Sequence, residues 1–309
     1  MAIVTTGFFD GVHLGHRHVL ETLVSCARER GQEAVVVTFW PHPRTVLQQD
    51  ARDFRILTSL EEKRGLLLSA GVDRVEVLPF TRDFAALTAA EYLKLLQDRF
   101  GATLVVMGYD NRIGSDRKTA EELMGSLSGS GAKTAEFAPG AFIFPVSSAK
   151  TAEFAPGALV SPEPVSSTRI RKALGEGRIE LANAMLGYSY QLYGVVVAGN
   201  RLGRTIGFPT ANMQLYEPLK LVPSNGVYAV EAEVLGATYK GMCNIGTRPT
   251  VGGTVRTIET HILDFEEDIY GLPLRLRFLR RIRDERRFPS LEELRQQLEE
   301  DRQICRMNK

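Results

Sequence analysis

The stretch AIVTTGFFDGVHLGHRHVLETLVSCARERG, residues 2–31, decides the fold of the first half of the chain. Its apolar opening, residues 2–8, predicts a buried strand. A helix is predicted next, because apolar side chains recur at helical spacing and stop before Gly31. Between the two lies GFFDGVHLGHRH, residues 7–18, with three of the chain's five histidines. The helical apolar positions are Val19, Leu20, Leu23, Val24 and Ala27.

The same alternation continues to about residue 108. The segments EAVVVTFW (33–40), RVEVLPF (74–80) and TLVVMG (103–108) predict further strands. LEEKRGLLLSAG (60–71) and TAAEYLKLLQDRFG (88–101) predict helices, the second capped by Thr88. Strands that are apolar throughout and joined by helices indicate an α/β fold with a doubly wound parallel sheet.

The pattern changes after residue 190. Five short runs bounded by Gly, Pro and Asn predict an antiparallel barrel or sandwich. One helix, residues 290–306, closes the chain, with Ser290 and Glu293 as a capping box. We therefore expect two domains, residues 1–185 and 186–309. The five runs are GVVVAGN (194–200), GVYAVEAEVLG (226–236), TYKGMCNIG (238–246), RTIETHILDF (256–265) and PLRLRFLRRIR (273–283).

Composition narrows the class of protein. A net charge of +1 over 309 residues gives no global field for nucleic acid or a membrane surface, so neither is expected as a partner. Three cysteines, widely spaced and odd in number, imply no disulfide framework. We see no signal peptide and no apolar run long enough to span a bilayer, so a cytoplasmic protein is expected.

One segment repeats letter for letter: AKTAEFAPGA occurs at residues 132–141 and again at 149–158. A single repeated pair is no solenoid. We interpret it as a neutral tandem duplication inside a surface loop, because loop-closure entropy grows slowly with length.

The junction at residues 7–18 favours an anion. Free backbone N–H groups and the helix dipole attract negative charge there, and Gly7, Gly11 and Gly15 let a phosphate approach the backbone. His13 and His16 can donate hydrogen bonds to phosphate oxygens. A zinc site and a purely structural pair are the alternatives, but zinc would need further ligands that the sequence does not offer at useful spacing.

A second glycine-rich, basic stretch is GNRLGRTIGFPTANM, residues 199–213. Arg201 and Arg204 can lie beside phosphate, and the glycines permit tight turns near an anion. Thr210 and Asn212 are two residues apart, so in an extended segment their oxygens point to one face and suit Mg²⁺. Taken singly, these are also ordinary loop residues.

The motif H-x-G-H after a first strand resembles the nucleotidylyltransferase superfamily, and SSTRIR (166–171) resembles its second motif. TFWPHP (38–43) and GYDNRIGSDRK (108–118) narrow the resemblance to the N-terminal module of bacterial bifunctional riboflavin kinase/FAD synthetases. That resemblance implies a Rossmann-like N-terminal domain. Asn111 and Ile113 depart from the family, where Phe is usual at both positions, and Thr119 stands where a Gly commonly follows the basic residue.

The second half resembles the flavokinase module of the same family. GRTIGFPTAN (203–212) is close to the flavokinase signature, and further blocks follow in the family's order. The resemblance implies a β-barrel with a terminal helix. The further blocks are GVYAV (226–230), NIGTRPT (244–250), IETHILDFEEDIYG (258–271) and RDERRFPSLEEL (283–294).

The resemblance also implies roles for residues. Glu259 would be the general base on riboflavin, with Asp264 and Glu267 as nearby alternatives, while His13, His16 and Arg171 would act in adenylylation. Thr210 and Asn212 would hold Mg²⁺ or another divalent cation. The residues that the resemblance implies for ATP binding are Gly7, Phe9, Asp10, Gly11, Gly15, Asp110, Ser166, Ser167, Thr168, Gly203, Arg204, Gly207, Thr210 and Asn212. The residues that it implies for flavin binding are Phe39, Pro41, His42, Pro43, Asn244, Arg248, Arg283 and Glu285.

The implied function is two-step synthesis of FAD. Riboflavin would be phosphorylated by ATP to FMN, and FMN adenylylated by a second ATP to FAD and pyrophosphate, by a monomer or weak homo-oligomer. One alternative is a riboflavin kinase whose adenylylating module is weakened at Asn111 and by the enlarged loop. Another is a flavin- or RNA-binding regulator on an inactive scaffold. The intact histidines, Glu259 and the Thr210/Asn212 pair argue against the regulator.

Overall fold

The computed structural model describes residues 1–47, 53–108, 111–127, 135–138, 141–146, 164–199, 202–250 and 253–307. The chain forms two compact units, each described separately below. The first comprises Met1–Glu153 with Pro162–Val165, and the second Phe154–Ser161 with Ser166–Lys309. Asp110, Arg201 and the second repeat copy at 149–158 lie outside the described residues.

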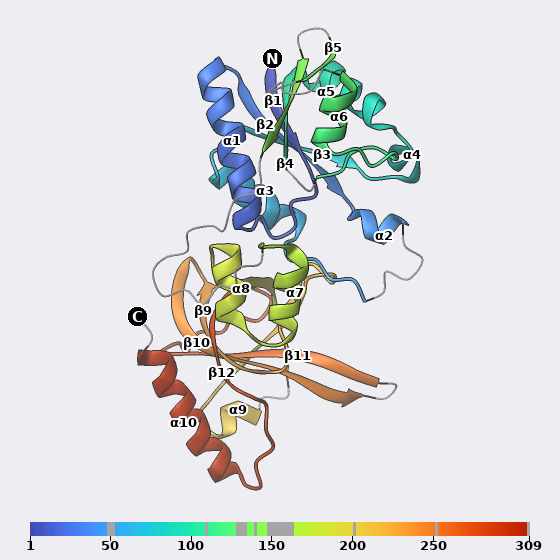
Figure 1. The fold of residues 1–309 in the computed structure, drawn as a ribbon. Coiled ribbons are helices and arrows are strands. Elements are labelled where there is room, and N and C mark those ends of the chain that lie inside the picture. The colour runs from blue at the N-terminus through green and yellow to red at the C-terminus, as the bar shows by residue number, and fades with distance from the viewer. Residues whose placement is uncertain are drawn as a thin grey trace. The chain divides into compact units, whose positions relative to one another are not determined.

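The first unit contains the predicted parallel sheet, with strand order β3-β2-β1-β4-β6-β5 (Figure 1). All neighbours pair in parallel except β5, which runs antiparallel to β6. The α/β prediction for this half is therefore confirmed. The strands are β1 (Ala2–Thr6), β2 (Glu33–Trp40), β3 (Arg74–Pro79), β4 (Ala102–Gly108), β5 (Ala135–Ala138) and β6 (Ala141–Val146).

The interpretation of the first repeat copy as loop was wrong for its described part. Residues 135–138 form β5, and β6 starts at Ala141 and pairs with β4 along the sheet. The physical reason is the run AFIFPV, whose apolar residues favour a strand beside an already buried neighbour.

Helices cover both faces of the sheet (Figure 1). α1 (Leu14–Arg30) and α3 (Leu60–Ser69) share one apolar core with the sheet, and α5 (Ala89–Phe100) and α6 (Ala120–Leu127) share another. The predicted cap is present, since Thr88 and Glu91 form a capping box. Short helices are α2 (Pro43–Leu47) and α4 (Arg82–Ala85).

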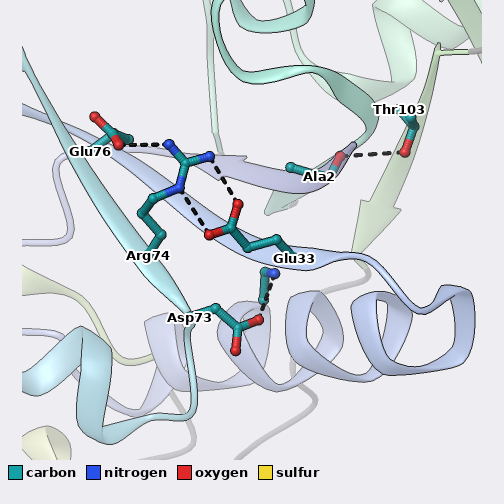
Figure 2. A network of polar contacts seen from close by, with 7 residues as sticks. Ala2, Glu33, Asp73, Arg74, Glu76 and Thr103 are labelled. Atoms are coloured by element: carbon teal, nitrogen blue, oxygen red, sulfur yellow. Dashed lines mark hydrogen bonds and ion pairs between the residues drawn. The ribbon is translucent and has the colours of Figure 1, made fainter.

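A polar network ties the amino ends of the strands together (Figure 2). Arg74, which opens β3, forms an ion pair of 3.0 Å with Glu33, which opens β2. Asp73 accepts a hydrogen bond of 2.8 Å from the Ala34 N–H, and Thr103 donates one of 3.3 Å to the Ala2 carbonyl (Figure 2). The polar side chains at the amino ends of the strands thus have structural roles. In open α/β sheets, ligands bind at the carboxyl ends of the strands.

The second unit contains a closed barrel with strand order β10-β11-β8-β7-β12-β9, all antiparallel. The prediction of an antiparallel barrel with a terminal helix is confirmed. Its strands are β7 (Gln191–Val197), β8 (Ala211–Leu215), β9 (Gly226–Val234), β10 (Ala237–Thr250), β11 (Gly253–Ile262) and β12 (Pro273–Arg283). Its helices are α7 (Ser167–Gly175), α8 (Ile179–Leu186), α9 (Leu202–Thr205) and α10 (Leu291–Met307).

Helix α10 packs on the outer surface of the barrel. Cys305 joins Ala229 of β9 and Met242 of β10 in one buried apolar cluster. At its start, Ser290 accepts a hydrogen bond of 3.2 Å from the Glu293 N–H, as the capping prediction required. The helix therefore covers the part of the barrel formed by β9 and β10.

Candidate active sites

The loop between β1 and α1 has an unusual backbone. Phe9 and Val12 have φ of 53° and 37°, and Gly11 has φ of 84°. Left-handed backbone at non-glycine residues costs of order 1–3 kcal/mol each and persists where the surroundings impose it. The loop is therefore held in a shape that the local sequence does not prefer.

Asp10 supplies part of that constraint. Its buried carboxylate accepts hydrogen bonds of 2.9 Å from the Leu57 N–H and 3.1 Å from the Thr58 N–H. The Thr58 hydroxyl in turn accepts one of 3.1 Å from the Gly11 N–H. These bonds give Asp10 a structural role beside the ATP-binding role that the sequence predicts.

The two histidines lie together at the start of α1. His13 is the N-cap residue, and its Nδ1 accepts a hydrogen bond of 3.4 Å from the His16 N–H. The rings stack with centroids 3.7 Å apart and planes 15° from parallel. Desolvation, together with the charges of His13 and Lys63, holds the pKa of His16 well below its usual value. His16 is therefore a neutral imidazole, which keeps one N–H to donate to a ligand.

The glycine at position 15 allows this packing. A Cβ added there would stand 3.3 Å from the His13 ring and 3.7 Å from the Val165 carbonyl oxygen. Within the described ranges, no three His, Cys, Asp or Glu side chains gather as a metal centre would require.

Of the TFWPHP segment, His42 reaches the loop. Its ring lies edge-on to that of Phe8, with centroids 4.0 Å apart, and 4.3 Å from that of Phe54. Pro41 is exposed after the end of β2, and Pro43 opens α2. Phe39 instead is partly buried and packs against the core, beside Phe80, Phe84 and Tyr92.

Lys63 of α3 is a residue that the sequence reasoning missed. Its side chain is fully buried, its Nζ donates a hydrogen bond of 2.9 Å to the Phe8 carbonyl, and it lies 3.7 Å from the centroid of the Phe8 ring. The available signal was its spacing four residues before the buried Leu67, which places a lysine on the apolar face of the helix.

The two departures from the family's Phe, at Asn111 and Ile113, are both accommodated. The Asn111 Nδ2 donates a hydrogen bond of 2.7 Å to the carbonyl of Thr6, the last residue of β1. Ile113 is buried in the core shared by α5 and α6. Asn111 therefore braces the strand end that leads into the loop between β1 and α1.

The segment SSTRIR forms the start of α7, in the second unit. Ser166 is the N-cap, and its side chain accepts a hydrogen bond of 3.3 Å from the Arg169 N–H. Ser167 opens the helix, Thr168 is exposed and Arg171 is partly buried. The amide groups of this first turn suit an anion.

In the barrel, strand register aligns residues from separate sequence blocks. Glu259 of β11 stands directly opposite Asn212 of β8 on one side and Asn244 of β10 on the other. The row continues through Val227 of β9 to Arg283 of β12. Directly opposed residues of antiparallel strands have Cβ atoms about 5 Å apart on one face. Four predicted site residues thus share one surface row.

Two further predicted residues lie at this row. The Arg248 guanidinium donates a hydrogen bond of 2.6 Å to Oε1 of Glu259. The Glu285 carboxylate occupies the space above Gly246, where an added Cβ would stand 2.3 Å from its Oε1 and 3.3 Å from Nδ2 of Asn244. The row therefore carries the amides of Asn212 and Asn244 and the ion pair of Glu259 and Arg248, with the Glu285 carboxylate beside them.

Arg283 is engaged elsewhere. Its guanidinium donates hydrogen bonds of 3.1, 3.0 and 2.8 Å to the carboxylate of Asp301, a fully buried residue of α10. The side chain predicted to border the flavin therefore anchors the terminal helix in this structure.

A cavity of about 590 Å³ opens at the Thr210 end of β8. Arg204 and Thr210 line it, together with Glu267, one of the alternative bases. Gly203 is required here, because an added Cβ would stand 2.2 Å from the Phe208 carbonyl oxygen. Gly207 has φ of 84°. The glycine-rich loop thus shapes one wall of a cavity large enough for a nucleotide.

In the described part of the chain, no helix has both the length and the apolar character needed to cross a bilayer.

Known proteins resemble the chain over nearly its whole length. The family model for FAD synthetase matches residues 1–139, and that for riboflavin kinase matches residues 186–308. The bifunctional riboflavin kinase/FMN adenylyltransferase of Bacillus subtilis is 36% identical over 306 residues, 98% of this chain and 90% of that protein. The Escherichia coli K12 protein of the same name is 38% identical, covering 98% and 91%.

A solved structure from Streptococcus pneumoniae, described as a macrolide-efflux protein, has the same fold. It aligns with a TM-score of 0.88 and 32% identity, covering 100% of this chain and 95% of that one. Two family models match in succession, and curated relatives above 30% identity span almost the entire sequence. The chain therefore belongs to the family of bifunctional riboflavin kinase/FMN adenylyltransferases.

Proposed function

We propose that this chain makes FAD in two steps. The barrel phosphorylates riboflavin with ATP to give FMN, and the α/β part adenylylates FMN with a second ATP to give FAD and pyrophosphate. The observation that carries the proposal is the row in which Glu259 stands between Asn212 and Asn244. The stacked His13 and His16 at the start of α1 supply the second centre.

For the kinase step, Glu259 is the proposed general base. Its carboxylate accepts the proton of the ribityl 5′-hydroxyl while that oxygen bonds to the γ-phosphorus and ADP leaves. Phosphoryl transfer needs mainly positioning, charge neutralisation and a proton acceptor. Asp264 is less suited, because its side chain is 73% exposed and it lies outside the row that holds Asn212 and Asn244.

A divalent cation fits the donors present. Thr210 and Asn212 offer neutral oxygens and Glu259 an anionic one, and Mg²⁺ prefers such hard ligands while keeping waters and substrate phosphates. We propose that Thr210 and Asn212 hold the ion. When bound, Mg²⁺ screens the charge between the polyphosphate and the attacking oxygen. Arg204 lines the cavity, and we propose that it binds nucleotide phosphate.

For adenylylation, no covalent enzyme intermediate is needed. An FMN phosphate oxygen attacks the α-phosphorus of ATP, the bond between the α-phosphorus and the bridging oxygen breaks, and pyrophosphate leaves. His13 and His16 donate hydrogen bonds to the phosphates, and the amides at the start of α1 stabilise developing charge. We assign the departing pyrophosphate to Arg171 and residues 166–168, on the strength of their motif and their helix start.

We further propose a functional division into residues 1–185 and 186–309. The two family models support it, because one ends at residue 139 and the other begins at residue 186. We also propose a cytoplasmic enzyme that works as a monomer or weak homo-oligomer. The three cysteines, all unpaired, are in keeping with a reducing compartment.

Two assays test the function. Purified protein is given riboflavin, ATP and Mg²⁺, and separately FMN, ATP and Mg²⁺, and the flavins are separated chromatographically. We expect FMN and FAD from the first mixture and FAD from the second. If the second mixture yields no FAD while the first yields FMN, the chain is a riboflavin kinase alone. If neither yields product, the proposal is wrong.

A further inference from the structure

Lys63 carries a charge that packing does not need. Its side chain is fully buried, and its Nζ lies 2.9 Å from the Phe8 carbonyl oxygen and 5.9 Å from the centroid of the Trp40 ring. A buried ammonium pays a desolvation penalty that a methionine of similar length would avoid. A lysine in such a position is a candidate for a functional charge.

The carboxylate that acts most on Lys63, that of Asp10, already accepts hydrogen bonds from backbone N–H groups. Asp10 attracts the Lys63 ammonium, but its oxygens accept hydrogen bonds from the Leu57 and Thr58 N–H groups. Lys63 instead contacts the Phe8 carbonyl and, 3.7 Å away, the face of the Phe8 ring. These contacts stabilise a cation only in part, so a further anion would be favourable there.

Lys63 lies beside the loop between β1 and α1. Phe8 immediately precedes the strained residues of the loop, and the hydrogen bond from Lys63 fixes its carbonyl. The Lys63 charge also lowers the pKa of His16, so the two groups interact electrostatically. An anion held at His16 would in turn attract Lys63.

We propose that Lys63 is a positioning residue for FMN adenylylation, one that fixes the Phe8 carbonyl and supplies a buried positive charge favouring the polyphosphate of ATP. The inference rests on the proposed adenylylation in the first unit. Lys63 touches the loop and acts through it, so we assign it no direct contact with the reacting atoms.

The protonation of Lys63 gives this role a measurable signature. Desolvation lowers its pKa to about 7, opposed by the charge of Asp10. Asp10 on the loop raises the pKa of Lys63, and Lys63 lowers the pKa of His16 on α1. His42 is the further titratable side chain beside Phe8, with ring centroids 4.0 Å apart. A bound polyphosphate favours the charged form and raises the pKa of Lys63. Above pH 7 the free enzyme loses this proton, so kcat/KM for adenylylation falls as pH rises.

The test is Lys63→Met in the full chain, with Lys94→Met as the matched control. Lys94 is an exposed lysine of α5 in the same unit, its side chain 72% exposed. We expect Lys63→Met to lower kcat/KM for FMN adenylylation roughly 10- to 100-fold, mainly through KM for ATP, and to lose the fall above pH 7. Riboflavin phosphorylation by the same preparations should stay within about twofold, because it occurs in the barrel.

The outcomes separate the two proposals. If wild-type protein makes no FAD from FMN, the function assignment is wrong. If wild-type protein makes FAD and Lys63→Met does so with the same KM and pH profile, the role of Lys63 is wrong. An equal loss in Lys94→Met would also overturn it.

A second measurement needs no active variant. Trp40 is the only tryptophan of the chain, so its fluorescence reports on the surroundings of Lys63. We expect wild-type emission to change with a midpoint at a pH of about 7, and the midpoint to rise when ATP is added. Emission that is constant between pH 6 and 8.5 would contradict a titrating lysine at this position.

Discussion

Glu259 and Arg248 form an ion pair of 2.6 Å across the hairpin of β10 and β11. Both side chains are partly exposed, at 20% and 39%, so the pair contributes little to the stability of the barrel. Its consequence is positional, because the guanidinium holds the carboxylate in one orientation within the row of Asn212 and Asn244. The contact uses Oε1 of Glu259.

Replacing Arg248 should therefore affect the kinase reaction alone. Arg248→Met is expected to lower kcat for FMN formation about tenfold, since a loosely oriented base transfers protons poorly. Arg248→Lys should restore part of the rate, because lysine keeps the charge without the planar fork. Steady-state rates of riboflavin phosphorylation measure this. Unchanged kcat in Arg248→Met would contradict the positioning role.

Glu259→Gln should stop FMN formation while supplied FMN is still adenylylated. Loss of a general base costs typically about 10²- to 10⁴-fold in rate. The matched control is Asp264→Asn, which removes the alternative carboxylate that binds Arg306. Chromatography of both reactions gives the answer. If Asp264→Asn, rather than Glu259→Gln, abolished FMN formation, our choice of base would be wrong.

His16→Ala should have the reverse effect. The substitution removes a hydrogen-bond donor and the ring that stacks on His13, so FAD formation from FMN is expected to fall by about 10² or more. Riboflavin phosphorylation should persist. His18→Ala serves as control, because His18 lies in the same first turns of α1 and no motif includes it. A loss of both reactions in well-folded His16→Ala protein would refute the two-site assignment.

The buried pair of Arg283 and Asp301 predicts a large stability effect. Asp301→Leu leaves the guanidinium of Arg283 without its partner, which should destabilise the barrel by about 3–5 kcal/mol. Urea unfolding followed by far-ultraviolet circular dichroism measures this, while Trp40 fluorescence reports the first unit separately.

The double variant Arg283→Met/Asp301→Leu separates stability from flavin binding. With both charges removed, most of the lost stability should return. If the refolded double variant keeps its KM for riboflavin, the prediction that Arg283 borders the flavin is wrong. A raised KM in the folded double variant would support that prediction.

Much of the local structure was readable from the sequence. Helix α5 begins after its cap Thr88 and ends before Gly101, because a capping box and a left-handed glycine are local signals. The alternation of apolar strands and amphipathic helices likewise indicated a parallel sheet, since hydrophobic periodicity depends only on neighbouring residues. The same reasoning failed at β5 and β6, where a partner strand far away in the sequence decides the outcome.

The candidate site residues also divide into those readable from local sequence and those that only tertiary contacts bring together. The sequence by itself predicted the loop between β1 and α1 with His13 and His16 as an anion site, because strand, glycines and helix are contiguous. Only the tertiary structure decided that Glu259 stands between Asn212 and Asn244, since strand register is fixed by pairing across the barrel. It also decided that Arg283 binds Asp301 and that Lys63 is buried at the Phe8 carbonyl. Those contacts join residues distant in the chain, and burial depends on what packs around a side chain rather than on its neighbours in sequence.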